Sequence, residues 1–231
     1  MSKKEELLDK LARAIADGDT QAAGKVAEEI IAAGIDPVEA VLQGATRGLE
    51  VVGDRFKRLE AFLPDLIQAG DAMKACVAVF KQHIKPEKMA ELSRGKIVIG
   101  TVYGDIHDIG KNLVATMLAA SGYEVQDLGI SVPVKRFIEE SEANKANVIA
   151  LSALLTQTSY YQKQLIDYLR DAGMRNKYYV VVGGAPVSPE WAKEIGADGY
   201  ARTAVGATQL INQLLTSGAK PPLPQPLVIN Q

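Results

Sequence analysis

The sequence predicts two parts: an N-terminal four-helix bundle, then an α/β domain with a doubly wound, five-stranded parallel sheet of the flavodoxin-like or Rossmann-like type. Up to about Lys85, apolar residues recur at the period of a helix. From Lys96 onward, short and nearly all-apolar runs alternate with helical patterns, which is typical of buried parallel strands joined by helices. A chain of 231 residues is long enough for two domains of this kind. The expected boundaries are 1–88 for the bundle, 89–95 for a linker, 96–218 for the α/β domain and 219–231 for a proline-rich tail.

Four helical stretches account for the first part. Leu7, Leu8, Leu11 and Ile15 form one apolar stripe, which the turn at residues 18–20 ends. A second helix ends at Gly34. The pair Asp36-Pro37 then predicts the start of a third helix, with the aspartate as its cap and the proline in its first turn. Leu-Pro at 63–64 opens the fourth. The short connections predict an antiparallel bundle.

Five strand candidates and five helix candidates alternate in the second part. The strand candidates are 96–103, 123–128, 147–152, 178–183 and 198–201. The helix candidates are 109–121, 134–144, 159–172, 188–195 and 204–215. In such sheets ligands bind beyond the carboxyl ends of the strands. The tail at 220–231 holds four prolines and is expected to run extended, without joining helix or sheet.

Composition and charge exclude several classes of protein. A net charge of −2 and an isoelectric point near 5.8 argue against non-specific nucleic-acid binding. A single cysteine, Cys76, excludes an internal disulfide framework and a cysteine-based metal cage. No run approaches the ~18 apolar residues of a membrane span. The first residues offer no apolar signal segment. We therefore expect a cytoplasmic protein that does not bind membranes.

A polar loop follows the first strand candidate, where a ligand of such a sheet would lie. It contains His107, one of only two histidines in the chain, and Asp105 two residues earlier. A metal-bound histidine commonly donates its other ring N–H to a carboxylate, which fixes the tautomer. Gly110 allows a bulky group to approach the backbone closely. The loop therefore predicts a ligand site centred on His107.

Two other interpretations of this loop have to be considered. Gly104 and Gly110–Lys111 resemble a phosphate-binding loop, but five residues separate the glycines where that loop has four. Asn112 also stands where a serine or threonine should hold magnesium. A structural histidine with satisfied hydrogen bonds would be the simpler interpretation if the loop stood alone.

Two further motifs follow the loop at informative spacings. Forty-one residues separate Gly110 from Ser152, and twenty-eight separate Leu154 from Gly183 and Gly184. Each motif falls at the carboxyl end of a strand candidate, so all three face one crevice. The set resembles the cobalamin-binding signature Asp-x-His-x-x-Gly, Ser-x-Leu and Gly-Gly, as in the cobalamin module of methionine synthase.

The resemblance implies a role for each position. His107 would replace the cofactor's own dimethylbenzimidazole as lower axial ligand of cobalt, and Asp105 with Thr158 would complete a hydrogen-bonded relay. Ser152 would contact the displaced base, with Thr156 close by, and the glycine pair would leave room for the nucleotide tail. The cofactor-binding positions implied are Gly104, Asp105, Ile106, His107, Asp108, Gly110, Ser152, Leu154, Thr156, Thr158, Gly183, Gly184 and Ala204.

The first part of the chain resembles the helical cap that accompanies this cobalamin fold. The segments 52–56 and 62–67 carry the likeness. There, the positions matching Phe56 and Leu63 cover the upper face of cobalt and shield the methyl group. Without the signature, an apolar pair at this spacing would be assigned to the core of the bundle.

A cap and a cobalamin domain resemble the small corrinoid proteins of methylotrophic methanogens and acetogens. The resemblance implies a non-catalytic methyl carrier that binds cobalamin or a related corrinoid. A donor-specific methyltransferase would load it from a methylamine, methanol, betaine or aryl methyl ether. A second methyltransferase would pass the methyl group to a pterin or thiol, and an ATP-dependent reductive activator would rescue oxidised cobalt. His107 would bind and leave the metal as its oxidation state changes.

Two alternative functions use the same cofactor. In a cobalamin-responsive sensor the two modules regulate a DNA-binding domain, and here only a short, nearly neutral helical segment precedes the cap. The small subunit of an adenosylcobalamin mutase is the other alternative, but mutases cover cobalt with a barrel and not with a helical cap.

Overall fold

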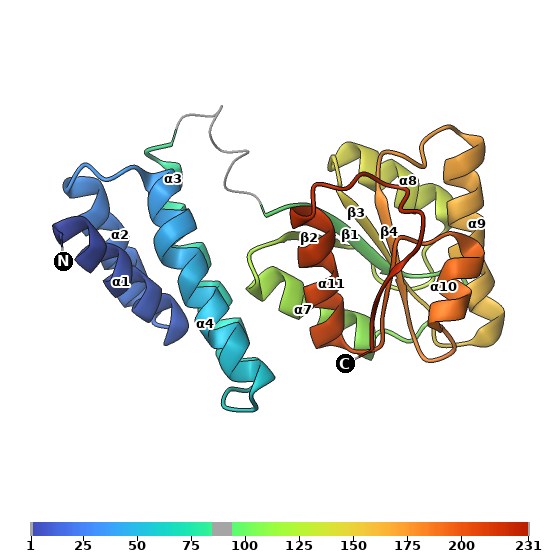
Figure 1. Cartoon of the computed structure of the whole chain (residues 1–231), viewed down its shortest axis with the longest axis horizontal. Coiled ribbons are helices and arrows are strands. Elements are labelled where there is room, and N and C mark those ends of the chain that lie inside the picture. Colours follow the sequence, from blue (N-terminus) through green and yellow to red (C-terminus); the bar gives the residue numbers. More distant parts are fainter. Residues whose placement is uncertain (1, 85–93, 231) are drawn as a thin grey trace. The chain divides into compact units, whose positions relative to one another are not determined.

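The computed structural model describes residues 2–84 and 94–230, which form two compact units (Figure 1). Of the described residues, the first unit holds 2–84, Arg94 and the short segment Ala119–Tyr123, and the second unit holds the parallel sheet. Most of the predicted linker, residues 89–93, lies outside the described residues. Within the described residues, no helix has both the length and the apolar character needed to cross a membrane.

The first unit is the predicted helical bundle. Its elements are α1 (Lys3–Ala16), α2 (Thr20–Ala32), α3 (Pro37–Ala40), η1 (Val41–Ala45), α4 (Thr46–Lys57) and α5 (Leu63–Lys81). The short π-helical turn η1 joins α3 to α4, so these three elements form the third predicted helix with one widened turn. The side chains of Asp19 and Asp36 cap two of the helices by accepting backbone N–H groups.

Close contact between α1 and α4 depends on a glycine in α4. A Cβ atom at Gly48 would lie 2.5 Å from the carbonyl oxygen of Ala12 and 2.6 Å from the Cβ of Ile15. Ile15 is fully buried at this crossing. The two backbones can therefore approach only because residue 48 has no side chain.

The second unit is a parallel sheet with the strand order β2-β1-β3-β4-β5-β6. Its strands are β1 (Lys96–Thr101), β2 (Glu124–Asp127), β3 (Val148–Ser152), β4 (Tyr179–Gly183), β5 (Gly199–Ala201) and β6 (Leu227–Ile229). The helices are α7 (Ile109–Ala120), α8 (Val134–Ala143), α9 (Thr156–Asp171), α10 (Pro189–Ile195) and α11 (Ala204–Thr216). The predicted fold class is confirmed, although α9 begins at Thr156 and not at residue 159.

The strand count and the tail are corrections to the sequence prediction. The tail supplies a sixth strand, because Leu227–Ile229 pairs in parallel with β5. All four prolines of the tail precede this segment. The strand itself is therefore free of proline, and its backbone groups can pair with the open edge of β5. The expectation that the tail stays outside the sheet is wrong.

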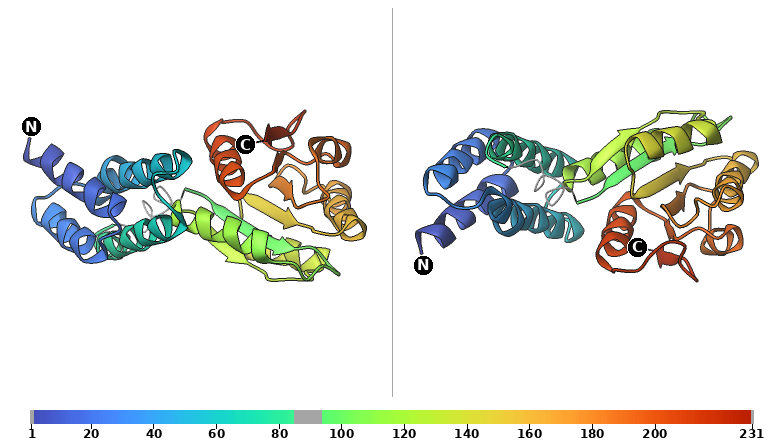
Figure 2. Two further views of the ribbon diagram at one scale, coloured as in Figure 1. Left: turned by 90° about the horizontal axis from the view of Figure 1, so that it is seen from below. Right: turned by 90° about the horizontal axis from the view of Figure 1, so that it is seen from above.

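Helices cover both faces of the sheet (Figure 2). On one face, a continuous apolar core joins Val98, Ile149 and Val180 of the strands to Phe137 of α8 and Leu165 of α9. Side chains of alternate strand residues point to the opposite face, toward α7 and α11. That second face is incompletely filled, and it contains the candidate site.

Candidate functional site

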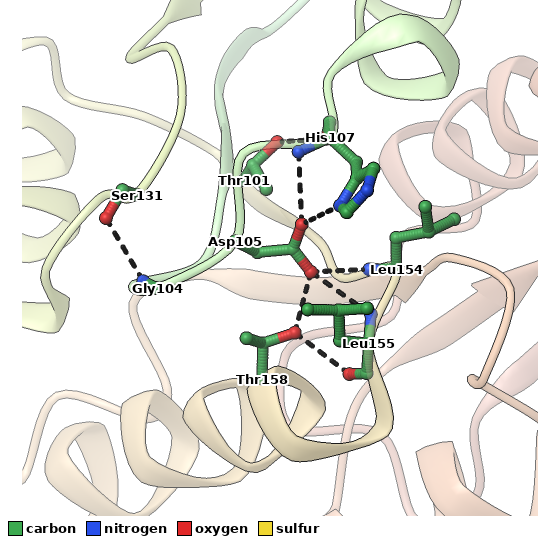
Figure 3. Close-up of polar contacts among 8 residues, drawn as sticks. All are labelled: Thr101, Gly104, Asp105, His107, Ser131, Leu154, Leu155 and Thr158. Atoms are coloured by element: carbon green, nitrogen blue, oxygen red, sulfur yellow. Dashed lines mark hydrogen bonds and ion pairs between the residues drawn. The ribbon is translucent and has the colours of Figure 1, made fainter.

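The site begins in the loop that follows β1 (Figure 3). The chain turns at Gly104, whose φ of +76° favours glycine. Its N–H donates to Ser131 Oγ at 3.1 Å, while the N–H of Ser131 donates to the carbonyl of Asp105 at 2.9 Å. Thr101, buried at the end of β1, donates its hydroxyl to the carbonyl of His107 at 3.0 Å. The loop is therefore fixed at both ends by hydrogen bonds within the protein.

Asp105 is the centre of this loop and is completely buried. Its Oδ1 accepts the backbone N–H of His107 at 3.1 Å and lies 2.8 Å from the ring Nδ1 of the same residue. Its Oδ2 accepts the N–H groups of Leu154 and Leu155 at 2.8 and 3.2 Å and the hydroxyl of Thr158 at 2.6 Å. Five contacts thus converge on one carboxylate, from the β1 loop, from the loop between β3 and α9, and from the first turn of α9 (Figure 3).

These contacts determine the charge of Asp105. Burial by itself raises the pKa of the carboxyl group, but the hydrogen bonds from Thr158, Leu154 and His107 outweigh burial and hold the pKa well below its usual range. Asp105 is therefore a carboxylate at neutral pH, and a carboxylate can only accept hydrogen bonds. The Nδ1 atom of His107 must then carry the proton.

The second ring nitrogen of His107 is consequently available to a ligand. With Nδ1 protonated, Nε2 of the neutral imidazole keeps its lone pair. The side chain is 45% exposed and lines a cavity in the second unit. This placement rejects the interpretation of His107 as a buried structural histidine.

The cavity has a volume of about 970 Å³ and lies between the sheet and the helices α7 and α11. That volume is at the upper end of the range of small-molecule sites. Nine residues implied by the resemblance line it: Ile106, His107, Asp108, Gly110, Ser152, Leu154, Gly183, Gly184 and Ala204. Much of the remaining wall is apolar, with Ile99, Val181 and Ile211 among its members.

Small residues explain why this face of the sheet is hollow. Ala150 lies in the middle of β3, and Gly183 and Ala201 are the last residues of the neighbouring strands β4 and β5. Ala204 and Ala207 line the same cavity from α11. Larger side chains at these positions would fill the space, because protein interiors otherwise pack to the density of crystals. The cavity is thus a property of residue size on one face of the sheet.

Other predicted site residues lie outside the cavity lining. Gly104, Asp105 and Thr158 support the lining from behind, through the contacts described above. Thr156 is exposed in the first turn of α9, and it does not line the cavity.

The two apolar residues of the predicted cap lie in the first unit. Phe56 stands in the last turn of α4 and Leu63 opens α5, and both are partly buried. Between them, Leu59 and Phe62 are 82% and 68% exposed. The role of Phe56 and Leu63 over a cofactor stays a prediction.

The two glycines of the Gly-Gly motif differ in their surroundings. A Cβ atom at Gly184 would lie 1.7 Å from the carbonyl oxygen of Ala153, and the φ of Gly184 is +126°. At Gly183 the nearest atom to such a Cβ would be the carbonyl oxygen of Ala201, at an ordinary 3.6 Å. Gly184 is therefore required by the backbone itself, whereas Gly183 leaves space in the cavity.

Sequence reasoning missed two residues that build the site. Gln162 of α9 is fully buried and donates to the carbonyls of Leu151 and Gly183 at 3.1 and 3.2 Å, while its Oε1 accepts the indole N–H of Trp191. It therefore ties the ends of β3 and β4 together. Ser131, which holds the turn at Gly104, has a φ of +50°. Neither residue belongs to a motif that a single sequence reveals.

The position of the Lys111 side chain contradicts the phosphate-loop interpretation. Its side chain is almost fully buried, with Nζ 2.5 Å from Asp127 and 2.6 Å from the side-chain oxygen of Asn112. A phosphate-binding lysine has to present its ammonium group to the ligand. Here the ammonium group already pairs with an aspartate of β2, so the lysine holds the start of α7 against the sheet.

The geometry fits a corrinoid. One imidazole with a free Nε2 lines a large, mainly apolar cavity between the sheet and two helices. Comparison with family models agrees: a B12 binding domain matches residues 95–208, and a second B12 binding domain matches residues 7–81.

Curated relatives match nearly the whole chain. A corrinoid protein of Desulfitobacterium hafniense is 45% identical over 210 residues, which cover 90% of this chain and 97% of that one. Trimethylamine corrinoid protein 1 of Methanosarcina acetivorans is 43% identical over 215 residues, covering 93% of this chain and all of the relative. The dimethylamine corrinoid protein of Methanosarcina barkeri is 44% identical over 212 residues, which cover 92% of this chain and 99% of the relative.

Solved structures give the same result. A cobalamin-binding protein from Desulfitobacterium hafniense matches with a TM-score of 0.67 and 34% identity, over 90% of this chain and 98% of that one. The methanol:cobalamin methyltransferase complex of Methanosarcina barkeri matches with a TM-score of 0.78 and 28% identity, over 94% of this chain and 82% of that one. The chain therefore belongs to the B12-binding family of corrinoid proteins, and its cofactor is a corrinoid.

Proposed function

We propose that this protein carries a methyl group on the cobalt of a bound corrinoid between a donor-specific methyltransferase and an acceptor methyltransferase. His107 is the lower axial ligand in this proposal, and the cofactor's own base lies in the cavity between the sheet, α7 and α11. When bound, the corrinoid supplies a metal that accepts a methyl group and releases it. The observation that carries the proposal is the 2.8 Å contact of His107 Nδ1 with a buried carboxylate, which leaves Nε2 free at the cavity.

The protein's own residues control that imidazole. Asp105 fixes the ring orientation and the tautomer, and it makes the ring a better donor through Nε2. An imidazole that is not bound to the metal could take up a proton at Nε2, and the Asp105 carboxylate would then stabilise the imidazolium. Thr158 holds the carboxylate in place through its 2.6 Å hydrogen bond. Phe56 and Leu63 keep their predicted role as the apolar cover of the methyl group.

The names of the relatives support a methylated amine as the source of the methyl group. Trimethylamine and dimethylamine corrinoid proteins share 41–44% of their residues with this chain. A structure of the methanol:cobalamin methyltransferase complex supports docking of a donor methyltransferase. The acceptor is proposed to be the pterin- or thiol-specific enzyme, and an ATP-dependent reductive activator would restore oxidised protein.

Coordination by His107 can be tested by electron paramagnetic resonance. Protein labelled uniformly with ¹⁵N is loaded with unlabelled cobalamin and reduced to the Co(II) state. Each line of the cobalt hyperfine pattern should split into a doublet, because the axial nitrogen then comes from the protein. Splitting into triplets would show that the cofactor's unlabelled base remains bound and would contradict the axial role of His107.

Two histidine variants identify the ligand. His107→Ala should abolish the doublet, whereas His83→Ala should leave it unchanged, because His83 lies beyond the end of α5 in the first unit. These are the two histidines of the chain, so the pair is a complete control. A doublet that survives His107→Ala would also contradict the assignment.

Carrier function is tested with the methyl group itself. Reduced, corrinoid-loaded protein is mixed with an isotopically labelled donor and the matching methyltransferase. Trimethylamine and dimethylamine are tested first, followed by methanol, betaine and an aryl methyl ether. The label should become bound to the corrinoid protein, and an acceptor methyltransferase should then remove it. If the protein binds cobalamin but never becomes labelled with any of the four donor classes, the carrier function is wrong, and a sensor becomes the better interpretation.

A further inference from the structure

The C-terminal strand β6 brings residues of the tail to the cavity. The N–H of Leu227 donates to the carbonyl of Asp198 at 2.9 Å, and the N–H of Arg202 donates to the carbonyl of Ile229 at 3.2 Å. The register of the pair, Ala201 opposite Ile229, places the next residues of both strands side by side. Asn230 and Arg202 therefore lie together at the carboxyl edge of the sheet, and both line the cavity.

A buried carboxylate holds the tail on this path. Asp198 is fully buried, and its Oδ1 accepts the N–H of Leu223 at 2.7 Å. Its Oδ2 accepts the N–H of Val180 at 2.6 Å and pairs with Arg175 at 2.8 Å. Hydrogen bonds to a buried, charged group are strong, so this carboxylate fixes the backbone groups that donate to it. The segment that leads into β6 is thus part of the fold of the second unit.

Arg202 differs from the other cation of the cavity wall. The ammonium group of Lys111 is neutralised by Asp127. Arg202 is exposed and makes no ion pair within the described residues. A guanidinium group can bind a phosphate through two parallel hydrogen bonds, and a carboxamide beside it adds one further donor. The end of the cavity at β5 and β6 therefore has the chemistry of an anion site, next to an apolar interior.

We propose that β6 completes the wall of the corrinoid cavity, and that Arg202 and Asn230 bind the phosphodiester of the cofactor's nucleotide loop. The inference rests on the proposed function, because it assumes that the cofactor's base and nucleotide enter this cavity. It assigns to the tail a role in selecting complete corrinoids over those that lack a nucleotide. The matched B12 binding domain ends at residue 208, so β6 lies outside the segment that matches this domain.

The test compares two corrinoids that differ in the nucleotide loop. Hydroxocobalamin carries the phosphodiester, and aquacobinamide lacks the whole nucleotide. Dissociation constants are measured by visible absorbance for the full-length wild type, Arg202→Gln, Asn230→Ala and a charge control, Lys220→Gln. Lys220 is an exposed cation of the same tail that does not line the cavity.

Arg202→Gln should weaken hydroxocobalamin binding by about 10- to 100-fold, the size of a lost charge-assisted hydrogen bond. Asn230→Ala should weaken it by about 2- to 10-fold, as for a neutral hydrogen bond. Neither variant should change the affinity for cobinamide, and Lys220→Gln should change neither affinity. Circular dichroism of each variant establishes that it is folded.

Three results would overturn the inference. An unchanged hydroxocobalamin affinity in Arg202→Gln would show that the guanidinium does not contact the phosphodiester. An equal loss for both corrinoids would show that the residue acts through the fold of the wall. A wild type that binds both corrinoids equally well would reject the subsite and leave the axial role of His107 intact. Wild-type protein that binds neither corrinoid would instead overturn the proposed function itself.

Discussion

Gly184→Ala is expected to destabilise the second unit by about 4 kcal/mol. A strained positive φ contributes about 1–3 kcal/mol and steric overlap in a packed region a similar amount. Both causes are present, because φ is +126° and the new Cβ would lie 1.7 Å from the carbonyl oxygen of Ala153. Urea unfolding followed by the fluorescence of Trp191, the single tryptophan, measures the effect in this unit.

Gly110→Ala is the matched control. This glycine lies in the first turn of α7, and a Cβ atom there would meet nothing within 4 Å. Stability should therefore stay unchanged or rise by about 0.5–1 kcal/mol, since alanine is the better helix former. The added methyl group would project into the space that Gly110 lines, so corrinoid affinity should fall. Equal stability losses in the two variants would contradict the structural distinction between these glycines.

Asp105→Asn is expected to cost about 2–4 kcal/mol of stability and to weaken coordination by His107. The carboxylate accepts five hydrogen bonds, whereas an amide presents its own N–H groups to some of the same donors. A neutral amide oxygen also accepts the Nδ1–H hydrogen bond more weakly than a carboxylate does, so the preference for a proton on Nδ1 falls. Urea unfolding gives the stability, and the spectrum of the Co(II) protein gives the fraction of His107 that is bound.

The pH dependence of stability distinguishes the contribution of the Asp105 charge from that of the side chain's shape. The pKa of Asp105 is lowered in the folded protein, so its stabilisation is present above the usual carboxyl pKa near 4. It is lost as pH falls below 4, by up to about 1.4 kcal/mol per pH unit. The difference in stability between wild type and Asp105→Asn should therefore shrink between about pH 4 and 2.5.

Asp108→Asn is the control for the change of charge in the same loop. Asp108 is only partly buried, and its Oδ2 accepts a hydrogen bond from the side chain of Asn112 at 3.0 Å. This variant should lose less than about 1 kcal/mol. A stability gap between wild type and Asp105→Asn that does not change with pH would contradict a lowered pKa for Asp105.

Local patterns in the sequence were sufficient for most elements of the fold. The period of apolar residues gave the helices of the bundle and the alternating strands and helices of the second part, because both signals depend on near neighbours in the chain. The same holds for the β1 loop, since Asp105 and His107 are two residues apart and their contact is local. β6 was missed because the prolines of the tail dominated its composition, and edge pairing is not a local property.

The sequence by itself determined the fold class, the loop with its histidine, and the three motifs that meet at the carboxyl ends of the strands. The tertiary structure alone decided how the site is held together. It brought the N–H groups of Leu154 and Leu155 to the second oxygen of Asp105, placed Gln162 between two strands, and seated Asn230 beside Arg202. These partners are separated in the chain by between 11 and about 50 residues, so their meeting depends on strand order and helix packing, which no short-range pattern encodes.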